Sequence, residues 1–330
     1  IGQACLAARS SKDKEVQVRK GTYFMRKALR LSPLDSGLRL VNFPGERPLI
    51  SGGLKISSWK RESQNRWSTA LSSLPVLPVR VVRSGTHFIN ASRYPKPATN
   101  SYTDGWLFAV SDSRSDQIIC ASNDLKRWSR PNDVQVVIFP DKGYLNEVAT
   151  VLKIDPLEGS ILLSPVPNAQ PIREGNRFYL RNVFESLDQP GTWCYVGSTN
   201  QLWVCPAVGN REPQEIYVPT CKTLIEMSGD ANNKQFLQDV TIAGFDFRDT
   251  AHAENVFAWG PVESALLLSA VQNCHITDNR FLTLGGNAVS LQKQSHGNEI
   301  SHNLFDEIGG GGILLNGDSS NQPFNNVIAD

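Results

Sequence analysis

Residues 274–281 (CHITDNRF) and residues 298–305 (NEISHNLF) are two copies of one short unit. Three positions match between the copies, each at an offset of 24 residues: Ile276 with Ile300, Asn279 with Asn303, and Phe281 with Phe305. A period in the low twenties, with strands of four or five residues, is typical of a solenoid whose stacked coils share one continuous core.

Further copies lie on both sides of this pair. Residues 240–247 (VTIAGFDF) keep the Ile and the final Phe, and residues 326–330 (NVIAD) begin a later copy. Second strands, residues 287–291 and 312–316, lie between the copies. We therefore predict an all-β fold, a right-handed parallel β-helix, in which Ile276, Ile300 and Ile328 form one internal ladder at a spacing of about 4.8 Å.

Asn279 and Asn303 are expected where each coil bends. Asn tolerates left-handed backbone geometry, and its amide can bond the equivalent amide one coil away, which satisfies buried backbone groups. A leucine-rich or α-helical repeat would need helices and a fixed Leu spacing that this sequence lacks. Most Asn residues of this region are therefore predicted to be structural.

The pattern divides the chain into three parts. Residues 1–58 are predicted to hold an N-terminal cap, with helix formers over residues 3–9, followed by the first coils. From Trp59 to Lys222 the period disappears, and aromatic-rich strand pairs with polar turns predict an inserted antiparallel β domain over residues 59–222. Residues 223–330 are predicted to resume the parallel β-helix, cut off in its last copy.

Composition narrows the functional classes. The 330 residues carry a formal net charge of +1, which gives no electrostatic argument for nucleic acid as a partner. No apolar run approaches the roughly 18 to 20 residues of a membrane span. A secreted or extracellular protein is expected, and Asn90 begins the N-x-S/T sequon Asn90-Ala91-Ser92 as a candidate glycosylation site.

The chain has six cysteines. Residues 194–205 read as a hairpin with its turn in residues 197–200, and pairing positions that sum to 399 sets Cys194 opposite Cys205. We predict a disulfide there, with two buried thiols as the alternative. The other four, Cys5, Cys120, Cys221 and Cys274, show no CxxC or Cys/His spacing, so neither a metal site nor a cofactor is predicted, and their pairing is left open.

Several segments, in fixed order, carry a family resemblance. They are residues 21–23 (GTY), 31–37 (LSPLDSG), 44–53 (PGERPLISGG), Trp59, 91–95 (ASRYP), 182–193 (NVFESLDQPGTW) and 201–206 (QLWVCP). With these segments the chain resembles proteins of glycoside hydrolase family 141 over nearly its whole length. The resemblance implies the β-helix architecture and an activity such as that of α-L-fucosidases or xylanases on complex plant glycans.

The resemblance also implies where the chemistry lies. Thr192 stands where such proteins usually carry Glu in a Gly-Glu-Trp motif, and their catalytic acids would lie on coils after the Gly-rich stretch at residues 309–312, largely beyond residue 330. We therefore expect a secreted protein that hydrolyses a fucosylated or xylan-like polysaccharide, and no robust turnover by residues 1–330 alone. The alternative is a non-catalytic structural or glycan-binding β-helix protein, and a polysaccharide lyase is a third choice.

Glycoside hydrolysis needs two carboxyl groups about 5 to 9.5 Å apart, distances that one or two coils of a β-helix supply. Asp278, His302 and Asp330 form such a column, two residues after the ladder Ile. The alternative interpretation is a solvent-exposed turn position that tolerates polar groups.

Asp306, Glu307 and Asp318 are further acidic candidates beside the Gly-rich bend, and the alternative interpretation is that these residues only form turns. The predicted partners are an oligo- or polysaccharide and a second chain that covers the C-terminal end of the solenoid.

Overall fold

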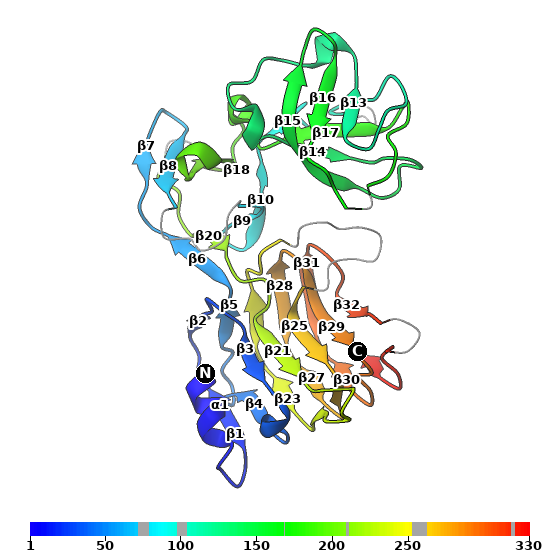
Figure 1. Cartoon of the computed structure of the whole chain (residues 1–330). Helices are drawn as coiled ribbons and strands as arrows, with labels where there is room; N and C mark the ends of the chain where they lie inside the picture. Colours follow the sequence, from blue (N-terminus) through cyan, green and yellow to red (C-terminus); the bar gives the residue numbers. More distant parts are fainter. Residues whose placement is uncertain (72–78, 98–103, 168, 209–210, 253–262, 318–320) are drawn as a thin grey trace.

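The structure is a computed structural model that describes residues 1–71, 79–97, 104–167, 169–208, 211–252, 263–317 and 321–330. Parallel strands coil into a β-helix, and a second body of mainly antiparallel strands, the insertion, lies above it in Figure 1. Helix α1 (Gly2–Ala8) lies at one end of the stack of coils, and the C-terminal strand lies at the other end (Figure 1). The β-helix is therefore the base on which the insertion stands.

The described part of the β-helix has three parallel sheets, and each coil adds one strand to each sheet. The first sheet contains β1 (Glu15–Val18), β4 (Arg39–Asn42), β23 (Thr241–Ala243), β27 (His275–Thr277), β30 (Glu299–Ser301) and β33 (Val327–Ala329). The second contains β2 (Thr22–Phe24), β5 (Leu49–Ser51), β24 (Asp246–Arg248), β28 (Arg280–Leu284) and β31 (Leu304–Ile308). The third contains β3 (Leu29–Leu31), β21 (Ile225–Ser228), β25 (Ser264–Ser269), β29 (Asn287–Gln292) and β32 (Ile313–Leu315), and the short β22 (Leu237–Gln238) pairs with β26 (Val271–Gln272).

The predicted ladders are confirmed by the strand register. Ile300 pairs with Ile276 on one side and with Ile328 on the other. The Phe281 ring stacks on that of Phe305 at 5.2 Å between centroids and on that of Phe247 at 5.1 Å. Burying one such side chain stabilises the fold by roughly 1.5–3 kcal/mol, so a stack of them holds each coil to the next.

The predicted Asn ladder is present as well. The Asn279 side-chain amide donates to the Ile242 carbonyl at 3.0 Å and to the Asn303 Oδ1 atom at 3.2 Å. The same Asn303 oxygen accepts a bond from the Asn279 backbone N–H at 3.0 Å. Each Asn thus satisfies backbone groups of the neighbouring coil at the corner between the first and second sheets.

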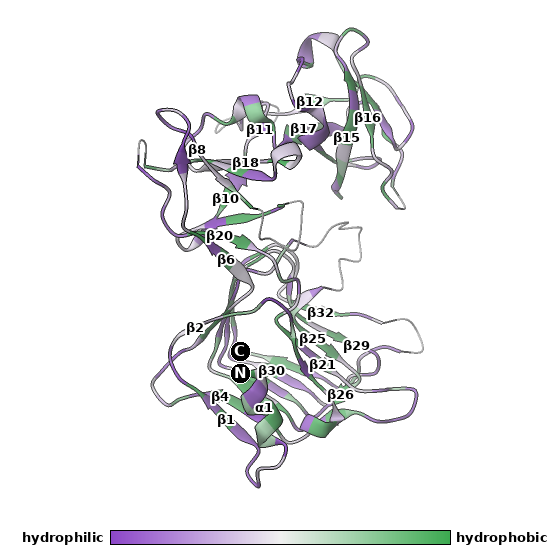
Figure 2. Ribbon diagram, turned by 60° about the vertical axis from the view of Figure 1, so that its left-hand side comes forward, coloured by the Kyte–Doolittle hydropathy of each residue, from purple (hydrophilic) through white to green (hydrophobic). Residues whose placement is uncertain are grey.

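Apolar side chains fill the inside of the coils, and α1 lies against the N-terminal end (Figure 2). Cys5 and Ala8 of α1 belong to this core. Arg9, just after the helix, donates to the buried Asp35 carboxylate at 2.7 and 2.8 Å. The helix expected over residues 3–9 therefore forms and covers the core at the first coil.

The insertion interrupts the second coil between β5 and β21. Strand β21 pairs with β3 of the first coil and with β25 of the third, so the interrupted coil is completed after the chain returns. The chain leaves through β6 (Gly53–Ile56) and comes back through β20 (Ile216–Pro219), which pair antiparallel. Strand pairing therefore changes from parallel to antiparallel at Gly53, a few residues before residue 59, where the insertion was predicted to begin.

Two sheets build the described part of the insertion, and their strand pairs are antiparallel except for β10 and β18. The first sheet, in order, contains β6, β20, β9 (Val82–Ser84), β10 (His87–Ala91), β18 (Thr192–Val196), β19 (Gln201–Cys205), β8 (Trp67–Ala70) and β7 (Lys60–Arg61). The second contains β11 (Arg93–Tyr94), β17 (Arg177–Arg181), β14 (Gln135–Ile138), β15 (Glu147–Asp155), β16 (Ser160–Leu163) and β13 (Gln117–Ile119), with β12 (Leu107–Phe108) on β17. Short 3-10 helices are η1 (Pro33–Asp35), η2 (Ser122–Asp124), η3 (Pro131–Asp133), η4 (Phe184–Ser186) and η5 (Gly197–Thr199).

A buried ion pair joins the insertion to the β-helix. Asp249, directly after β24, has no exposed surface and accepts bonds from Arg83 of β9 at 2.5 and 2.9 Å. The Ser51 hydroxyl donates to the same carboxylate at 2.6 Å. A Cβ atom on Gly53 would lie 2.9 Å from the Asp249 Cβ atom. Glycine is therefore the residue that fits at the point where the chain leaves the coil. Because the pair is buried, loss of one partner would leave an uncompensated charge inside the protein.

The hairpin register corrects the disulfide prediction. The turn lies at residues 197–200 as expected, but Val196 then faces Gln201, so paired positions sum to 397 rather than 399. Cys194 faces Trp203, and Cys205 faces Thr192. Both are free thiols buried in one small cluster with Leu187, and burial raises the pKa of Cys194 to about 12.

Candidate functional site

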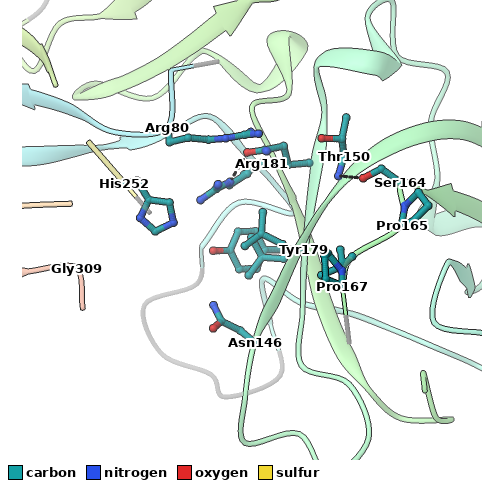
Figure 3. A pocket seen from close by; sticks show the side chains of 14 residues that line it. Arg80, Asn146, Thr150, Ser164, Pro165, Pro167, Tyr179, Arg181, His252 and Gly309 are labelled. Carbon is teal, nitrogen blue, oxygen red and sulfur yellow. Dashed lines mark hydrogen bonds between the residues drawn. The ribbon is translucent and has the colours of Figure 1, made fainter. Parts of the chain in front are cut away.

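A pocket of about 350 Å³ lies between the second sheet of the insertion and the β-helix. Its volume is within the range of roughly 300–1,000 Å³ that is usual for small-molecule sites. Half of its described lining residues are polar side chains of the insertion, and five more are apolar residues of the insertion. The polar ones are Arg80, Gln135, Asn146, Thr150, Ser164, Tyr179 and Arg181, and the apolar ones are Val137, Val148, Pro165, Val166 and Pro167. His252 and Gly309 line it from the β-helix, across from Tyr179 in Figure 3.

Strand β17 supplies the pocket through its alternation. Phe178 and Leu180 have no exposed surface and belong to the core of the second sheet. Successive side chains of a strand point to opposite faces, so Arg177, Tyr179 and Arg181 share the other face. Gln135 of β14 pairs with Arg181 and lies on that face too. The core therefore fixes the direction of the polar side chains that reach the pocket.

Arg181 is held in a particular orientation. Its Nε atom donates to the Gln135 side-chain oxygen at 2.8 Å. Burial, and to a smaller extent the neighbouring Arg80 charge, lowers the pKa of Arg181 to about 10. The side chain therefore remains charged at neutral pH.

The Tyr179 ring is fixed by aromatic and cationic neighbours. The Arg93 guanidinium lies 3.8 Å from the ring centroid, and the Trp106 ring lies edge-on at 5.4 Å. In Figure 3 the Tyr179 side chain points into the space in front of His252. Arg93 therefore covers one face of the ring, and the rest of this fixed side chain is the part that can contact a ligand in the pocket.

The β-helix contributes a Gly-rich corner. The His252 Nδ1 atom donates to the Gly285 carbonyl at 3.1 Å, which orients the imidazole ring. A Cβ atom on Gly285 would lie 2.6 Å from the backbone nitrogen of His252. A Cβ atom on Gly309 would lie 2.8 Å from the backbone carbonyl oxygen of Gly285. Glycine is therefore required here by the close stacking of coils, and Gly309 also lines the pocket.

A second hollow of about 290 Å³ extends the pocket, and the two share Arg80, Gln135 and Thr150. Asp133 lines this extension and accepts a bond from the Gly197 backbone N–H at 3.0 Å. Burial raises the pKa of the Asp133 carboxyl. A carboxyl group with a raised pKa in a cleft is a candidate for binding or proton transfer.

The predicted column does not reach the pocket. Thr277, Ser301 and Ala329 are in register, so Asp278, His302 and Asp330, which follow them, are stacked as expected. All three side chains are exposed, at the end of β28 opposite to Gly285 and the pocket. Asp278 and His302 have φ values of +56° and +54°, the left-handed geometry of a turn.

The other acidic candidates also lie outside the described pocket lining. Asp306 is exposed on β31, and Asp318 lies outside the described residues. Glu307, next to Asp306, contacts the insertion instead. Its carboxylate accepts a hydrogen bond from the Phe88 backbone N–H at 3.0 Å and lies 2.5 Å from the His87 Nδ1 atom. Glu307 therefore helps to hold the insertion above the β-helix.

Within the described part of the chain, no group of three or more His, Cys, Asp or Glu side chains is placed to hold a metal ion. Among these residues, no helix has the length and apolar character needed to cross a membrane.

With this geometry in view, comparison with known proteins gives one family match. A family model described as "Right handed beta helix region" matches residues 231–328. The chain contains a right-handed parallel β-helix. The match covers the coils after the insertion, where Ile276 and Ile300 pair.

Two solved structures are similar to the chain. One is titled "Glycoside hydrolase", with a TM-score of 0.75 and 15% identity, covering 92% of this chain and 63% of that chain. The other is titled "The complex structure of XylC with xylose", with a TM-score of 0.34 and 12% identity, covering 91% of this chain and 49% of that chain. No curated protein sequence matches significantly. At these identities the first likeness shows the fold, and the resemblance to glycoside hydrolase family 141 stays a prediction.

The residues that line the pocket were not predicted from the sequence. The run Arg177-Phe178-Tyr179-Leu180-Arg181 alternates charged or aromatic polar residues with apolar ones, which is the signal of a strand with one polar face. That signal could have identified β17. It could not have shown that Arg80 and His252, far away in the sequence, meet this face.

Proposed function

We propose that this protein is glycan-active and that the pocket between the insertion and the β-helix binds a saccharide. The observation that supports this is the lining of the pocket, in which the fixed Tyr179 ring is surrounded by amide, hydroxyl and guanidinium groups. A sugar ring has apolar faces that pack on aromatic rings and hydroxyl groups that bond to amides. Gln135 and Asn146 supply such amides in the lining.

We further propose that the reaction is hydrolysis of a fucosylated or xylan-like polysaccharide outside the cell, as the family resemblance implies. Two carboxyl groups are needed, about 5–5.5 Å apart for retention of configuration and about 6.5–9.5 Å apart for inversion. In this proposal the pocket binds and orients the glycan, and the acid–base pair lies outside its described lining. Asp133 in the extension is placed to contact the bound chain.

Binding is tested by calorimetry with xylo-oligosaccharides and fucosylated oligosaccharides. Tyr179→Ala should weaken binding at least about tenfold, because truncating a buried aromatic anchor commonly costs 2 kcal/mol or more. Tyr144→Ala is the matched control, since Tyr144 belongs to the same insertion, is 73% exposed and does not line the pocket. Absence of binding to every oligosaccharide, or an equal loss in both variants, would contradict the proposal.

Hydrolysis is tested separately with aryl fucosides and xylo-oligosaccharides. The assay compares residues 1–330 with the longest form of the protein. Release of products by the longer form alone would support the proposed reaction and the position of the carboxyl pair. Comparable turnover by residues 1–330 would contradict that position and make Asp278, His302 and Asp330 the first residues to mutate. Binding without turnover by either form would favour the non-catalytic glycan-binding alternative.

A further inference from the structure

The pocket and its extension lie along one face of the second sheet of the insertion. Val134 and Val136 belong to the core of this sheet. Successive side chains of a strand point to opposite faces, so Gln135 and Val137 share the other face. Val137 lines the pocket, Gln135 lines both hollows, and Asp133, two residues before Gln135, lines the extension. The two hollows therefore follow one another along β14.

The neighbouring strands continue this arrangement. Gln135 pairs with Thr150 of β15, and both residues line the two hollows. Val137 pairs with Tyr179 of β17, which lines the pocket. Asp133 comes four residues before Val137, a separation of about 13 Å along an extended chain. This distance is longer than one sugar ring, so Tyr179 and Asp133 are placed to contact different units of a bound glycan.

The Asp133 carboxyl group is held in a fixed position. The Gly197 backbone N–H donates to its Oδ1 atom at 3.0 Å, and the Asn182 side-chain amide donates to the Asp133 backbone carbonyl at 2.8 Å. A Cβ atom on Gly197 would lie 2.8 Å from the same Oδ1 atom, so glycine allows this close approach. Burial raises the pKa of the Asp133 carboxyl group. Among the described lining residues of the two hollows, Asp133 is the only acidic one.

This carboxyl group can form more hydrogen bonds than the one from Gly197. Each carboxylate oxygen has two acceptor sites, and the Gly197 N–H uses one of them. A sugar hydroxyl both donates and accepts hydrogen bonds, so the carboxyl group can bond neighbouring hydroxyls in either protonation state. Because the group is fixed before binding, little conformational entropy is lost when a sugar unit enters the extension.

We propose that the pocket and its extension are two adjacent subsites for an oligosaccharide of at least two units, in which the first unit contacts Tyr179 and the hydroxyl groups of the second unit bond to the Asp133 carboxyl group. This inference rests on the proposed function, because it specifies the length of the saccharide that the site binds and the residue that recognises its second unit.

The experiment compares three probes with the whole chain by calorimetry: methyl β-xyloside, which has one unit, xylobiose, which has two, and phenyl β-xyloside, in which an apolar ring replaces the second unit. A parallel series uses methyl α-fucoside, a fucosyl-galactose disaccharide and phenyl α-fucoside. In the series that binds, we expect the two-unit probe to bind at least about tenfold more tightly than either other probe, because its second unit adds hydrogen bonds to Asp133.

The outcomes separate this inference from the proposed function. Equal binding of the one-unit and two-unit probes would overturn the inference and leave the proposed function standing. Binding of the phenyl glycoside as tight as that of the two-unit probe would overturn the role of Asp133, because an apolar ring offers no hydroxyl group to it. Absence of binding to every probe would contradict both proposals.

Variants then test the residue itself. Asp133→Ala should reduce the difference in affinity between the two-unit and one-unit probes to within about twofold. Gly197→Ala should act in the same direction, because its Cβ atom displaces the Asp133 oxygen, and it tests the point if Asp133→Ala does not fold. Asp124→Ala is the matched control, since Asp124 ends η2 as Asp133 ends η3 and is not among the described lining of either hollow. A difference retained in both Asp133→Ala and Gly197→Ala, or lost equally in Asp124→Ala, would overturn the assignment.

Discussion

The β-helix and the insertion are built by different rules. In the β-helix, Ile276 meets the residue 24 positions later, and the same pairing recurs from coil to coil. The pocket is lined instead by Arg80 and Arg181 of the insertion and by His252 of the β-helix, which come from distant parts of the chain. The coils are held together by contacts that recur from one coil to the next, whereas the pocket depends on single side chains from both regions. The comparison indicates that repeated contacts build the β-helix and that the pocket is built by contacts that do not repeat.

The largest expected effect is in the repeat. Phe281→Ala removes a fully buried ring from the stack with Phe247 and Phe305 and should destabilise the protein by about 3–5 kcal/mol. Chemical denaturation followed by the β-sheet circular dichroism signal measures the change. Leu304→Ala, on the next coil and 53% exposed, should change stability by no more than about 0.5 kcal/mol. Similar losses in both variants would mean that the ladder is not the source of stability.

The next effect is at the junction of the two regions. Arg83→Gln leaves the buried Asp249 without its charged partner, which should cost about 3 kcal/mol. The result should be easier proteolysis between the insertion and the β-helix. Lys96→Gln removes an exposed pair with Asp188 in the insertion and should change stability by less than about 1 kcal/mol. If Arg83→Gln were as stable as Lys96→Gln, the two regions would not be joined through this ion pair.

A smaller effect separates ladder positions from turn positions. Asn279→Ala removes bonds to the neighbouring coils and should cost about 1–3 kcal/mol. Asp278→Asn keeps a residue that tolerates the left-handed backbone and should be nearly neutral in stability and in saccharide binding. Thermal melts of both variants test this difference. A large loss of saccharide binding in Asp278→Asn would contradict the placement of the site in the pocket.

Much of the β-helix could be predicted because its contacts repeat in the sequence. The offset of 24 residues places Ile276, Asn279 and Phe281 directly beside their partners. The hairpin register was predicted wrongly, because a turn at residues 197–200 sets Val196 opposite Gln201, a sum of 397, whereas pairing Cys194 with Cys205 needs a sum of 399. A register depends on turn geometry as well as on the apolar pattern.

The site could be predicted far less well. Acidic residues near the repeat attracted the prediction, yet Asp278 and Asp306 are exposed and lie outside the described pocket lining. The pocket depends on how the insertion stands on the β-helix, which is set by contacts such as Arg83 with Asp249 and Phe88 with Glu307. These pairs are separated by 166 and 219 residues, so no local pattern reveals them.

The most direct test of the central claim is a crystal structure of the protein with a bound xylo-oligosaccharide or fucosylated oligosaccharide. We expect sugar density between Tyr179 and His252, which both line the pocket. Density on the exposed turn of Asp278 and His302, or anywhere else outside the pocket, would contradict it.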